Sequence, residues 1–512
     1  MLWPDKAKKI LAKFKIEKLK DPQYNAINEL LSGNDVIVLM ETGGGKSLCY
    51  QLPPLIVKKV MFVISPLISL MEDQKNKLLS LGISCTALHN ENDNKYDEIK
   101  EIINGKIRIV YMSPEYLLKV SSNSDEENEP DYIGGIGLAK QLIELNMLGF
   151  LAVDESHCCS SWGHDFRPKY KDIKIFREMF PEIPIIAVTA TATDIVYNDI
   201  KKMLQLNDPV IVKESSDRPN LYLKVILPTK ELSKQNKIPR EIEILTYLKK
   251  YSEDKIIIYV DTVKDTETLS MKLNKLIKDC CKPYYAKLDH NIKEQTQNDF
   301  SNGKIKIIVC TTAFGLGIDQ TVKCVIISGC PSSVEDYYQQ IGRAGRTGIH
   351  CETIFFFDHY KLISKKAMIK KNFGNANMQL FKIKDNNIDK VKDFAYITTC
   401  RRKYILEYFN EMIPLFNCNN CDNCCEQDMV DITDIVMRKD FNLIKNKYIL
   451  YNYNIDKNIK DWITYIRNNK IQKENILEKL KIKIPRKFLI EEKKVENSFE
   501  KIIEKFEKIL EL

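Results

Sequence analysis

The sequence predicts an α/β protein that has two parallel-sheet domains in tandem, then a helical module with a metal site, then a short, mainly helical C-terminal region. Three observations support this prediction. Short, β-branched apolar runs recur through the first 360 residues and alternate with segments of helical spacing. Cysteines gather between Cys400 and Cys425, and Lys-, Ile- and Asn-rich sequence follows from Val430. Continuous apolar runs are typical of strands buried on both faces of a parallel sheet.

The apolar runs predict enough strands for two sheets, because strand–helix alternation on this scale is typical of α/β architecture. We expect the sheets to divide near residues 213–218. The predicted units are residues 1–213, 214–360, 361–429 and 430–512. The runs that predict strands end at Met40, Ser65, Met112, Asp154, Ala190, Val260, Cys310, Ser328 and Phe357.

Composition narrows the class of protein. The chain has 512 residues, of which 44% are hydrophobic and 29% charged, as in ordinary globular proteins. No apolar stretch reaches the roughly 18–20 residues of a membrane span, and the N-terminus lacks the apolar core of a secretory signal. We therefore expect a soluble, intracellular protein without membrane contact. The sequence does not distinguish nucleus, cytoplasm and a viral compartment, nor does it indicate an oligomeric state.

The net charge and two further segments of the sequence add expectations about partners and local structure. The 78 basic and 70 acidic residues give a net charge of +8, which permits a polyanionic partner without demonstrating one. Residues 121–130 (SSNSDEENEP) are polar and acidic, and predict a solvated loop. Apolar residues at 3–4 spacing between Val495 and Leu510 predict an amphipathic helix near the C-terminus.

A glycine-rich segment follows the first predicted strand. Residues 40–47 read METGGGKS, and residues 48–52 can begin a helix. Glycines let several backbone N–H groups face one phosphate, and the helix N-terminus adds positive potential. Met40 replaces the first glycine of the general phosphate-loop pattern. The segment predicts a nucleotide site formed by Thr42, Gly43, Gly44, Gly45, Lys46, which would reach the phosphates, and Ser47, which would hold Mg²⁺.

Two further elements complete a hydrolytic site. Asp154 and Glu155 follow the apolar run FLAV, so Asp154 can orient the water shell of Mg²⁺ and Glu155 can polarise the attacking water. About 300 residues away from the phosphate loop, Arg343 and Arg346 are separated by Ala344 and Gly345. Two arginines on such a loop could reach the γ-phosphate across a domain cleft, and stabilise the transition state when the cleft closes.

Four cysteines follow a metal-ligand spacing, C-x17-C-x2-C-x2-C. Four thiolates at such spacings form a closed tetrahedral site whose usual occupant is Zn²⁺ with a structural role. An iron–sulfur cluster is the alternative. Cys425 is an adjacent thiol that could replace Cys424. The expected ligands are Cys400, Cys418, Cys421 and Cys424.

These elements, in this order, resemble the superfamily 2 helicases, whose motor consists of two RecA-like domains. The segment DESHCCSSWGHDFRPKY (154–170) is similar to the DExH box and aromatic-rich loop of the RecQ DNA helicases. The resemblance covers roughly residues 14–425. Other segments that resemble RecQ motifs are LKDPQ (19–23), SPLISLMEDQ (65–74), SPEYL (113–117), VTATAT (188–193), DRPNL (217–221), TTAFGLGID (311–319), YYQQIGRAGRTG (337–348) and the cysteine cluster.

The resemblance implies roles for residues whose function the spacing alone does not reveal. It implies adenine recognition by Gln23, beside Lys20, which stands where the family usually has arginine. It implies nucleotide contacts from the second domain by Gly317, Asp319 and Gln339. Aromatic and basic side chains suit a sequence-independent grip on single-stranded DNA. The implied DNA contacts are Trp162, His164, Phe166 and Arg167, and the implied relay between ATP and DNA consists of His157, Thr189 and Thr191.

The sequence therefore predicts an ATP-dependent 3′–5′ DNA helicase of RecQ type, with ATP, Mg²⁺ and Zn²⁺ as cofactors and with single-stranded and tailed duplex DNA as partners. The alternatives are an RNA-dependent ATPase, a DNA translocase without unwinding, and an annealing or scaffolding protein whose ATPase is vestigial. Residues 430–512 predict either a reduced winged helix or a small helical appendix. The basic cluster Lys481, Lys483, Arg486 and Lys487 suits both interpretations.

Overall fold

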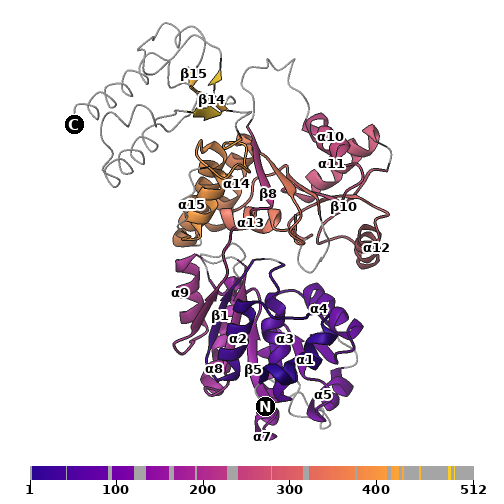
Figure 1. The fold of residues 1–512 in the computed structure, drawn as a ribbon, viewed down its shortest axis with the longest axis vertical. Coiled ribbons are helices and arrows are strands. Elements are labelled where there is room, and N and C mark those ends of the chain that lie inside the picture. Colours follow the sequence, from indigo (N-terminus) through magenta and orange to yellow (C-terminus); the bar gives the residue numbers. More distant parts are fainter. Residues whose placement is uncertain are drawn as a thin grey trace, which may run out of the picture.

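The computed structural model describes most of the chain up to Cys425 and four short strands beyond it. The described ranges are 3–41, 43–89, 95–119, 134–160, 167–190, 193–227, 240–277, 279–314, 322–374, 377–411, 417–425, 429–431, 449–450, 483–485 and 489–490. Two α/β lobes lie one above the other, and a group of helices lies beside the second lobe (Figure 1).

Lobe 1 contains a seven-stranded sheet in the order β3-β4-β2-β5-β6-β1-β7, in which all pairs are parallel. Its strands carry apolar side chains on both faces, so Ile37 packs in one core cluster while its neighbours Val36 and Val38 pack in another. The strands are β1 (Val36–Leu39), β2 (Val60–Ile64), β3 (Cys85–Leu88), β4 (Ile109–Met112), β5 (Leu148–Val153), β6 (Ile185–Thr189) and β7 (Val210–Lys213).

Helices cover both faces of this sheet and complete its two cores. The helix that begins at Lys46 also packs against the first two helices of the chain. The helices are α1 (Trp3–Lys13), α2 (Asp21–Leu31), α3 (Lys46–Val57), α4 (Ile68–Ser80), α5 (Lys95–Ile103), α6 (Pro114–Leu117), α7 (Gly135–Glu144), α8 (Lys174–Met179) and α9 (Asp194–Met203), with 3₁₀ helices η1 (Ser156–Cys159) and η2 (Pro168–Ile173).

Lobe 2 contains a six-stranded parallel sheet in the order β10-β11-β9-β12-β13-β8. Its first strand in the chain, β8, lies at the edge, next to the connection from lobe 1. The strands are β8 (Leu221–Ile226), β9 (Ile256–Tyr259), β10 (Cys281–Tyr284), β11 (Ile307–Cys310), β12 (Cys324–Ile327) and β13 (Cys351–Phe356). The helices are α10 (Arg240–Lys250), α11 (Val263–Leu276), α12 (His290–Ser301) and α13 (Val334–Ile341).

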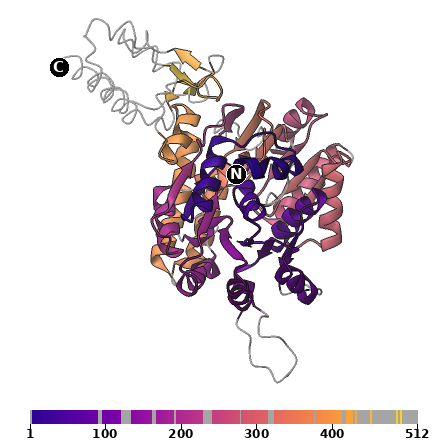
Figure 2. The same cartoon turned by 60° about the horizontal axis from the view of Figure 1, so that its bottom comes forward.

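A helical module follows lobe 2 and shares its core. It consists of α14 (His359–Phe373), α15 (Met378–Tyr396), α16 (Arg401–Tyr408) and the cysteine loop 417–425. Phe394 of α15 and Tyr337 of α13 have ring centroids 4.7 Å apart. The cysteine loop pairs with the edge strand β8 through Leu223 and Cys421. In Figure 2 the orange helices of this module lie along one side of the molecule.

Beyond the module, the described residues form two antiparallel strand pairs. β14 (Met429–Asp431) pairs with β16 (Lys483–Pro485), and β15 (Ile449–Leu450) pairs with β17 (Leu489–Ile490). The predicted amphipathic helix at 495–510 and the acidic loop at 121–130 lie outside the described residues, as do Lys481, Arg486 and Lys487. In the described part of the chain, no helix has the length and hydropathy needed to cross a membrane.

The structure confirms the predicted fold class. All nine apolar runs singled out in the sequence coincide with strands of the two sheets. The predicted division between the sheets at 213–218 falls in the connection between β7 and β8. Within the two sheets, the strands that coincide with no such run are β3, β7, β8 and β10.

Candidate nucleotide site and zinc centre

The glycine-rich segment forms a tight turn between β1 and α3. Gly43 and Gly45 have φ angles of +87° and +92°, in the left-handed region that favours glycine. The Gly44 N–H donates to the Glu41 carbonyl at 3.0 Å. The Lys46 ammonium donates to the carbonyls of Met40 and Glu41, both at 3.1 Å. The turn is thus shaped as a phosphate cradle at the N-terminus of a helix.

Gln23 of α2 lies against this turn. Its amide nitrogen donates to the Gly45 carbonyl at 3.2 Å, and its amide oxygen accepts from the Lys20 N–H at 3.0 Å. The φ angle of Gly45 favours glycine, and a Cβ there would also displace that amide nitrogen. The sequence-predicted Gln23 and phosphate loop are therefore adjacent. Thr42 lies outside the described residues.

Asp154 and Glu155 follow β5 at the same end of the sheet. The Asp154 carboxylate accepts from the Glu155 N–H at 2.9 Å and from the Tyr50 hydroxyl at 3.2 Å. Burial raises the pKa of Asp154 to about 7, and Glu155 adds to this rise while Lys46 opposes it. Glu155 has a φ of +46°, which turns the chain sharply after the strand.

Lys46 completes a compact charged group with these carboxylates and with two arginines from lobe 2. Burial lowers the pKa of Lys46, Glu155 and Asp154 oppose the lowering, and Arg343 and Arg346 add to it. A Cβ on Gly43 would lie 3.2 Å from Cγ of Arg346, so this arginine packs directly on the phosphate loop. Two arginines and a lysine beside the glycine-rich turn are suited to bind a negatively charged phosphate chain.

The Nε atom of Arg343 is a buried donor without a hydrogen-bond partner among the described residues, and the Arg343 side chain is almost fully buried. A buried unpaired guanidinium donor beside the cradle indicates that an anion completes this site. The residues present therefore fit a nucleoside triphosphate. Ser47, at the start of α3, and Asp154 provide the oxygen ligands that Mg²⁺ prefers.

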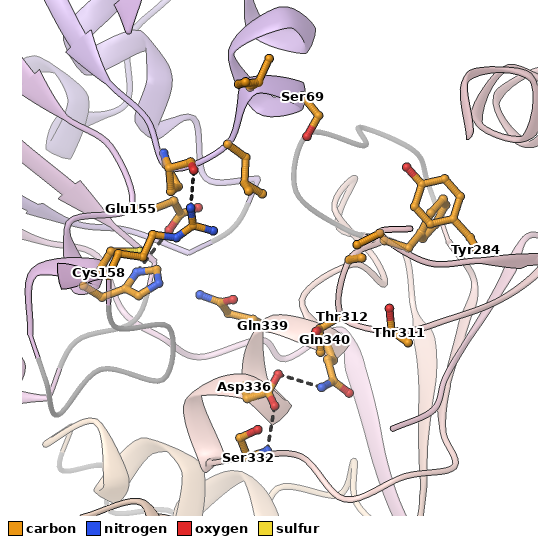
Figure 3. A pocket seen from close by; sticks show the side chains of 18 of the residues that line it. Ser69, Glu155, Cys158, Tyr284, Thr311, Thr312, Ser332, Asp336, Gln339 and Gln340 are labelled. Carbon is orange, nitrogen blue, oxygen red and sulfur yellow. Dashed lines mark hydrogen bonds and ion pairs between the residues drawn. The ribbon is translucent and has the colours of Figure 1, made fainter. Parts of the chain in front are cut away.

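A cavity of about 900 Å³ extends from this site between the lobes. Ser69, Glu155 and Cys158 lie on its lobe 1 side, and Thr312, Gln339 and Gln340 face them from lobe 2 (Figure 3). Gln339 was expected from the sequence to face the nucleotide from lobe 2, and it lies on α13 in the wall of this cavity. Gly317 and Asp319 lie outside the described residues.

His157 joins Glu155 to the end of β6, and Arg167 lies in the wall of the cavity. His157 Nδ1 lies 2.9 Å from the Thr189 hydroxyl and 3.3 Å from Glu155 Oε2. Arg167 lines the cavity and donates to the Pro66 carbonyl, at the start of the segment before α4. The other predicted DNA and relay residues, Trp162, His164, Phe166 and Thr191, lie outside the described residues.

The cysteine cluster forms a second site, next to lobe 2. The Sγ atoms of the four predicted ligands all lie within 4.8 Å of one another, and Cys425 is not a member of this group. A tetrahedral zinc site has Zn–S bonds of about 2.3 Å, so the cluster fits this ion. Backbone N–H groups of Lys403 and Asn420 point at Cys400 and Cys418 sulfurs, at 3.5 and 3.4 Å. Such donors stabilise thiolates.

A buried arginine supports the zinc loop. Arg401 is fully buried, and its guanidinium donates to the Asp422 carboxylate and to the Phe394 carbonyl. Asp422 Oδ2 also accepts from the Val225 N–H of β8 at 3.0 Å. Neither Arg401 nor Asp422 was predicted from the sequence to support the zinc loop. The signal available was their position, since Arg401 directly follows the first cysteine and Asp422 lies between the third and fourth.

Two RecA-like lobes with a phosphate loop on one and paired arginines on the other define a motor ATPase of the helicase type. Family models match three consecutive segments: DEAD/DEAH box helicase at residues 20–200, helicase conserved C-terminal domain at 235–348, and RecQ zinc-binding at 361–425. The chain belongs to the RecQ family of superfamily 2 helicases.

Individual relatives support this assignment. The chain is 38% identical over 424 residues to "Putative ATP-dependent RNA helicase R290" of Acanthamoeba polyphaga mimivirus, covering 82% of this chain and 72% of that protein. It is 34% identical to ATP-dependent DNA helicase Q1 of Rattus norvegicus (85% and 67%). It is 37% identical to ATP-dependent helicase SGS1 of Saccharomyces cerevisiae (80% and 28%). The chain thus spans little more than a quarter of the yeast relative.

Solved structures show the same fold at low identity. The helicase MrfA bound to DNA and AMPPNP matches with a TM-score of 0.57 at 18% identity, over 72% of this chain and 52% of that one. Dbp5 of S. cerevisiae bound to RNA and ADP BeF3 matches with a TM-score of 0.51 at 16% identity, over 75% and 97%. These likenesses support the two-lobed fold.

Proposed function

We propose that this protein is a DNA-stimulated ATPase that moves 3′ to 5′ along single-stranded DNA and unwinds tailed duplexes, in DNA repair, recombination or replication. The observation that carries the proposal is the packing of Arg346 on Gly43, which brings the arginine loop of lobe 2 onto the phosphate cradle of lobe 1. Hydrolysis across such a cleft couples each catalytic cycle to a change in lobe separation.

In this mechanism each residue has a defined task. Lys46 and the loop glycines hold the phosphates of ATP, and Gln23 lies where the family recognises adenine. Glu155 accepts a proton from the attacking water, and Arg343 and Arg346 stabilise the charge that develops on the γ-phosphoryl oxygens. We assign nucleotide contacts from lobe 2 to Gln339, Gly317 and Asp319, as the family resemblance implies. Mg²⁺, held by Ser47 and Asp154, would neutralise negative charge on the phosphates.

The interlobe cavity supports the proposed coupling to nucleic acid. Its lobe 1 lining includes Glu155 and His157, which lie at the nucleotide site, together with Arg167, Ser69 of α4 and Ser113 at the start of α6. Hydroxyl and guanidinium groups bind phosphate oxygens without reading sequence. We assign the DNA grip to Arg167 together with Trp162, His164 and Phe166, and the relay to His157, Thr189 and Thr191.

RNA is the second candidate substrate, because the mimivirus relative is named an RNA helicase. The deciding experiment measures ATP hydrolysis with no nucleic acid, with single-stranded DNA and with RNA, alongside unwinding of 3′- and 5′-tailed duplexes. We expect DNA stimulation and unwinding of the 3′-tailed duplex. Preferential stimulation by RNA would overturn the DNA assignment. Stimulation by DNA without unwinding of any duplex would reduce the activity to translocation.

A further inference from the structure

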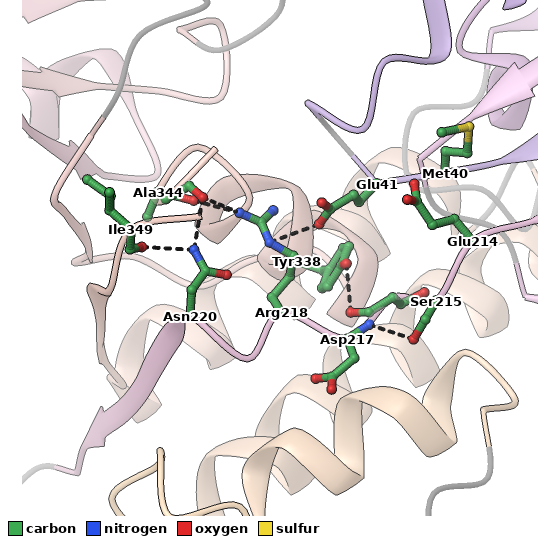
Figure 4. Close-up of polar contacts among 12 residues, drawn as sticks. Met40, Glu41, Glu214, Ser215, Asp217, Arg218, Asn220, Tyr338, Ala344 and Ile349 are labelled. Carbon is green, nitrogen blue, oxygen red and sulfur yellow. Dashed lines mark hydrogen bonds and ion pairs between the residues drawn. The ribbon is translucent and has the colours of Figure 1, made fainter. Parts of the chain in front are cut away.

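A buried arginine at the junction of the lobes connects the arginine loop to the phosphate loop. Arg218 lies in the connection between β7 and β8. Its Nη2 atom donates to the carbonyls of Ala344 and Gly345, at 2.9 and 3.2 Å, and Figure 4 shows these bonds. Ala344 and Gly345 separate Arg343 from Arg346, so Arg218 holds the backbone between the two arginines of lobe 2.

The same guanidinium reaches lobe 1. Arg218 Nε lies 2.8 Å from Oε2 of Glu41, the residue just before the glycine turn (Figure 4). The backbone carbonyl of Glu41 accepts from Lys46 Nζ at 3.1 Å. A short path therefore runs from Lys46 through Glu41 and Arg218 to the arginine loop. Each of its contacts is an ion pair or a hydrogen bond.

The surroundings make the Arg218–Glu41 ion pair strong. The two side chains are 8% and 23% exposed, so solvent screens the pair weakly. Burial raises the pKa of Glu41, Arg218 opposes that rise, and the neighbouring Glu214 adds to it. Lys20 lies 3.5 Å from Glu214, so that carboxylate has a cation of its own. Arg218, together with Lys20, thus favours the ionised form of Glu41 and opposes the effect of burial on its pKa.

Arg218 could have the purely structural role of attaching the segment between β7 and β8 to lobe 2. Other contacts, however, already attach this segment. Arg402 of α16 donates to the Arg218 carbonyl at 3.0 Å and pairs with Asp217 at 3.1 Å. The Tyr338 hydroxyl donates to the Ser216 carbonyl at 2.9 Å. These contacts all join the connection to lobe 2 and its zinc-binding module. The Arg218–Glu41 pair instead crosses to the phosphate loop.

We propose that Arg218 is a positioning residue for ATP hydrolysis, which fixes Arg343 and Arg346 relative to Lys46 through its ion pair with Glu41. This proposal rests on the proposed function, because it concerns the same ATP site. Arg218 touches neither the phosphate cradle glycines nor Lys46 directly. Its loss should therefore slow the catalytic step while leaving ATP affinity nearly unchanged.

The expected loss of kcat follows from the sensitivity of catalysis to the placement of catalytic groups. A misplacement of about 1 Å in catalytic groups can cost about 100-fold in rate. We expect Arg218→Gln to lower kcat for DNA-stimulated hydrolysis by about 10- to 100-fold, with KM for ATP changed by less than about threefold. Glu41→Gln removes the partner charge with little change in shape, and should lower kcat in the same direction. The double variant should lose no more activity than Arg218→Gln alone, because Glu41→Gln breaks only the ion pair that Arg218→Gln has already removed.

The test measures kcat and KM for ATP, at saturating single-stranded DNA, in the full chain and these three variants. Glu352→Gln is the matched control, because Glu352 of β13 pairs with Lys250 of α10 and neither residue lines the cavity between the lobes. Thermal unfolding of each variant identifies loss of folding. Unchanged kcat in Arg218→Gln and Glu41→Gln, or independent losses that multiply in the double variant, would overturn the inference. A wild-type chain without DNA-stimulated hydrolysis would instead refute the proposed function.

Discussion

The Nδ1 atom of His157 lies 2.9 Å from the hydroxyl oxygen of Thr189, so the segment after β5 is joined to the end of β6 beside the nucleotide site. His157 is buried and also lies next to Glu155. The imidazole thus contacts both the expected catalytic base and the strand that leads into the VTATAT segment. This contact lies where we propose the relay between ATP hydrolysis and DNA.

Thr189→Val should uncouple hydrolysis from DNA. Valine keeps the shape of threonine but removes the hydroxyl, so His157 loses a hydrogen bond that holds its ring. We expect the DNA stimulation of the ATPase to fall about tenfold or more, a loss of at least ~1.4 kcal/mol, while the unstimulated rate changes much less. ATPase assays with and without single-stranded DNA measure this ratio.

The matched control is Thr86→Val in β3 of the same sheet. Thr86 is equally buried, and its hydroxyl has no hydrogen-bond partner among the described residues. This variant should retain the stimulation of the wild type. Normal stimulation in Thr189→Val would show that the His157–Thr189 contact has no part in coupling.

Glu155→Gln should separate ATP binding from ATP hydrolysis. Glutamine preserves the size of the side chain but cannot accept a proton from water, and general-base catalysis contributes about 10²–10⁴-fold in rate. We expect kcat to fall within that range while nucleotide affinity stays close to that of the wild type. Steady-state kinetics and equilibrium binding of a fluorescent ATP analogue measure the two quantities. Glu144→Gln, at an exposed position on α7, is the control. Retained hydrolysis in Glu155→Gln would assign the base elsewhere and favour a vestigial ATPase.

The sequence predicted the central strands well because they are buried on both faces. The nine continuous apolar runs carry that signal in their composition alone. The strands of the two sheets without such a run, β3, β7, β8 and β10, are the four edge strands. β8 alternates buried and half-buried residues because only part of its surface faces the core. β10 includes Lys282 and Pro283, which a central strand would not tolerate.

The candidate site was predictable to the extent that its residues lie in recognisable segments. The phosphate loop, Asp154, Glu155, the two arginines and four cysteines each occur in a short motif. The contacts of Tyr50 with Asp154 and of Arg218 with Glu41 join residues 104 and 177 positions apart, taken as the differences of their residue numbers. Such pairs depend on how the strands are ordered and how the lobes meet, which local sequence does not encode.

Metal content tests the cysteine site. We expect the purified protein to contain one zinc ion and neither iron nor acid-labile sulfide, because the four sulfurs lie within 4.8 Å of one another, close enough to bind a single ion. Cys421→Ser should lose zinc, since serine replaces a thiolate with a much poorer zinc ligand. Elemental analysis measures the zinc and iron per chain in the wild type and in Cys421→Ser, and a sulfide assay measures acid-labile sulfide. The loss should be accompanied by a lower midpoint of thermal unfolding, because Cys421 lies fully buried against β8.

Cys425→Ser is the matched control for that experiment, because Cys425 lies outside the group of four converging sulfurs. It should retain a full complement of zinc. Loss of zinc from Cys425→Ser together with retention in Cys424→Ser would show that Cys425, and not Cys424, is the fourth ligand. Stoichiometric iron and sulfide in the wild type would show that the four cysteines hold an iron–sulfur cluster and not zinc.

Asp422→Asn should destabilise the zinc-binding module and its attachment to lobe 2. The change leaves the fully buried guanidinium of Arg401 without its anionic partner, and removal of one member of a buried ion pair costs about 3–5 kcal/mol. Asp389→Asn is the control within the same module, because the Lys366–Asp389 pair joins side chains that are 26% and 40% exposed. A pair so accessible to solvent should contribute only about 0–1 kcal/mol. Thermal unfolding monitored by circular dichroism compares the two variants at one pH and salt concentration. Equal shifts of the midpoint would show that the Arg401–Asp422 pair does not hold the module together, whereas a markedly larger shift in Asp422→Asn is the expected result.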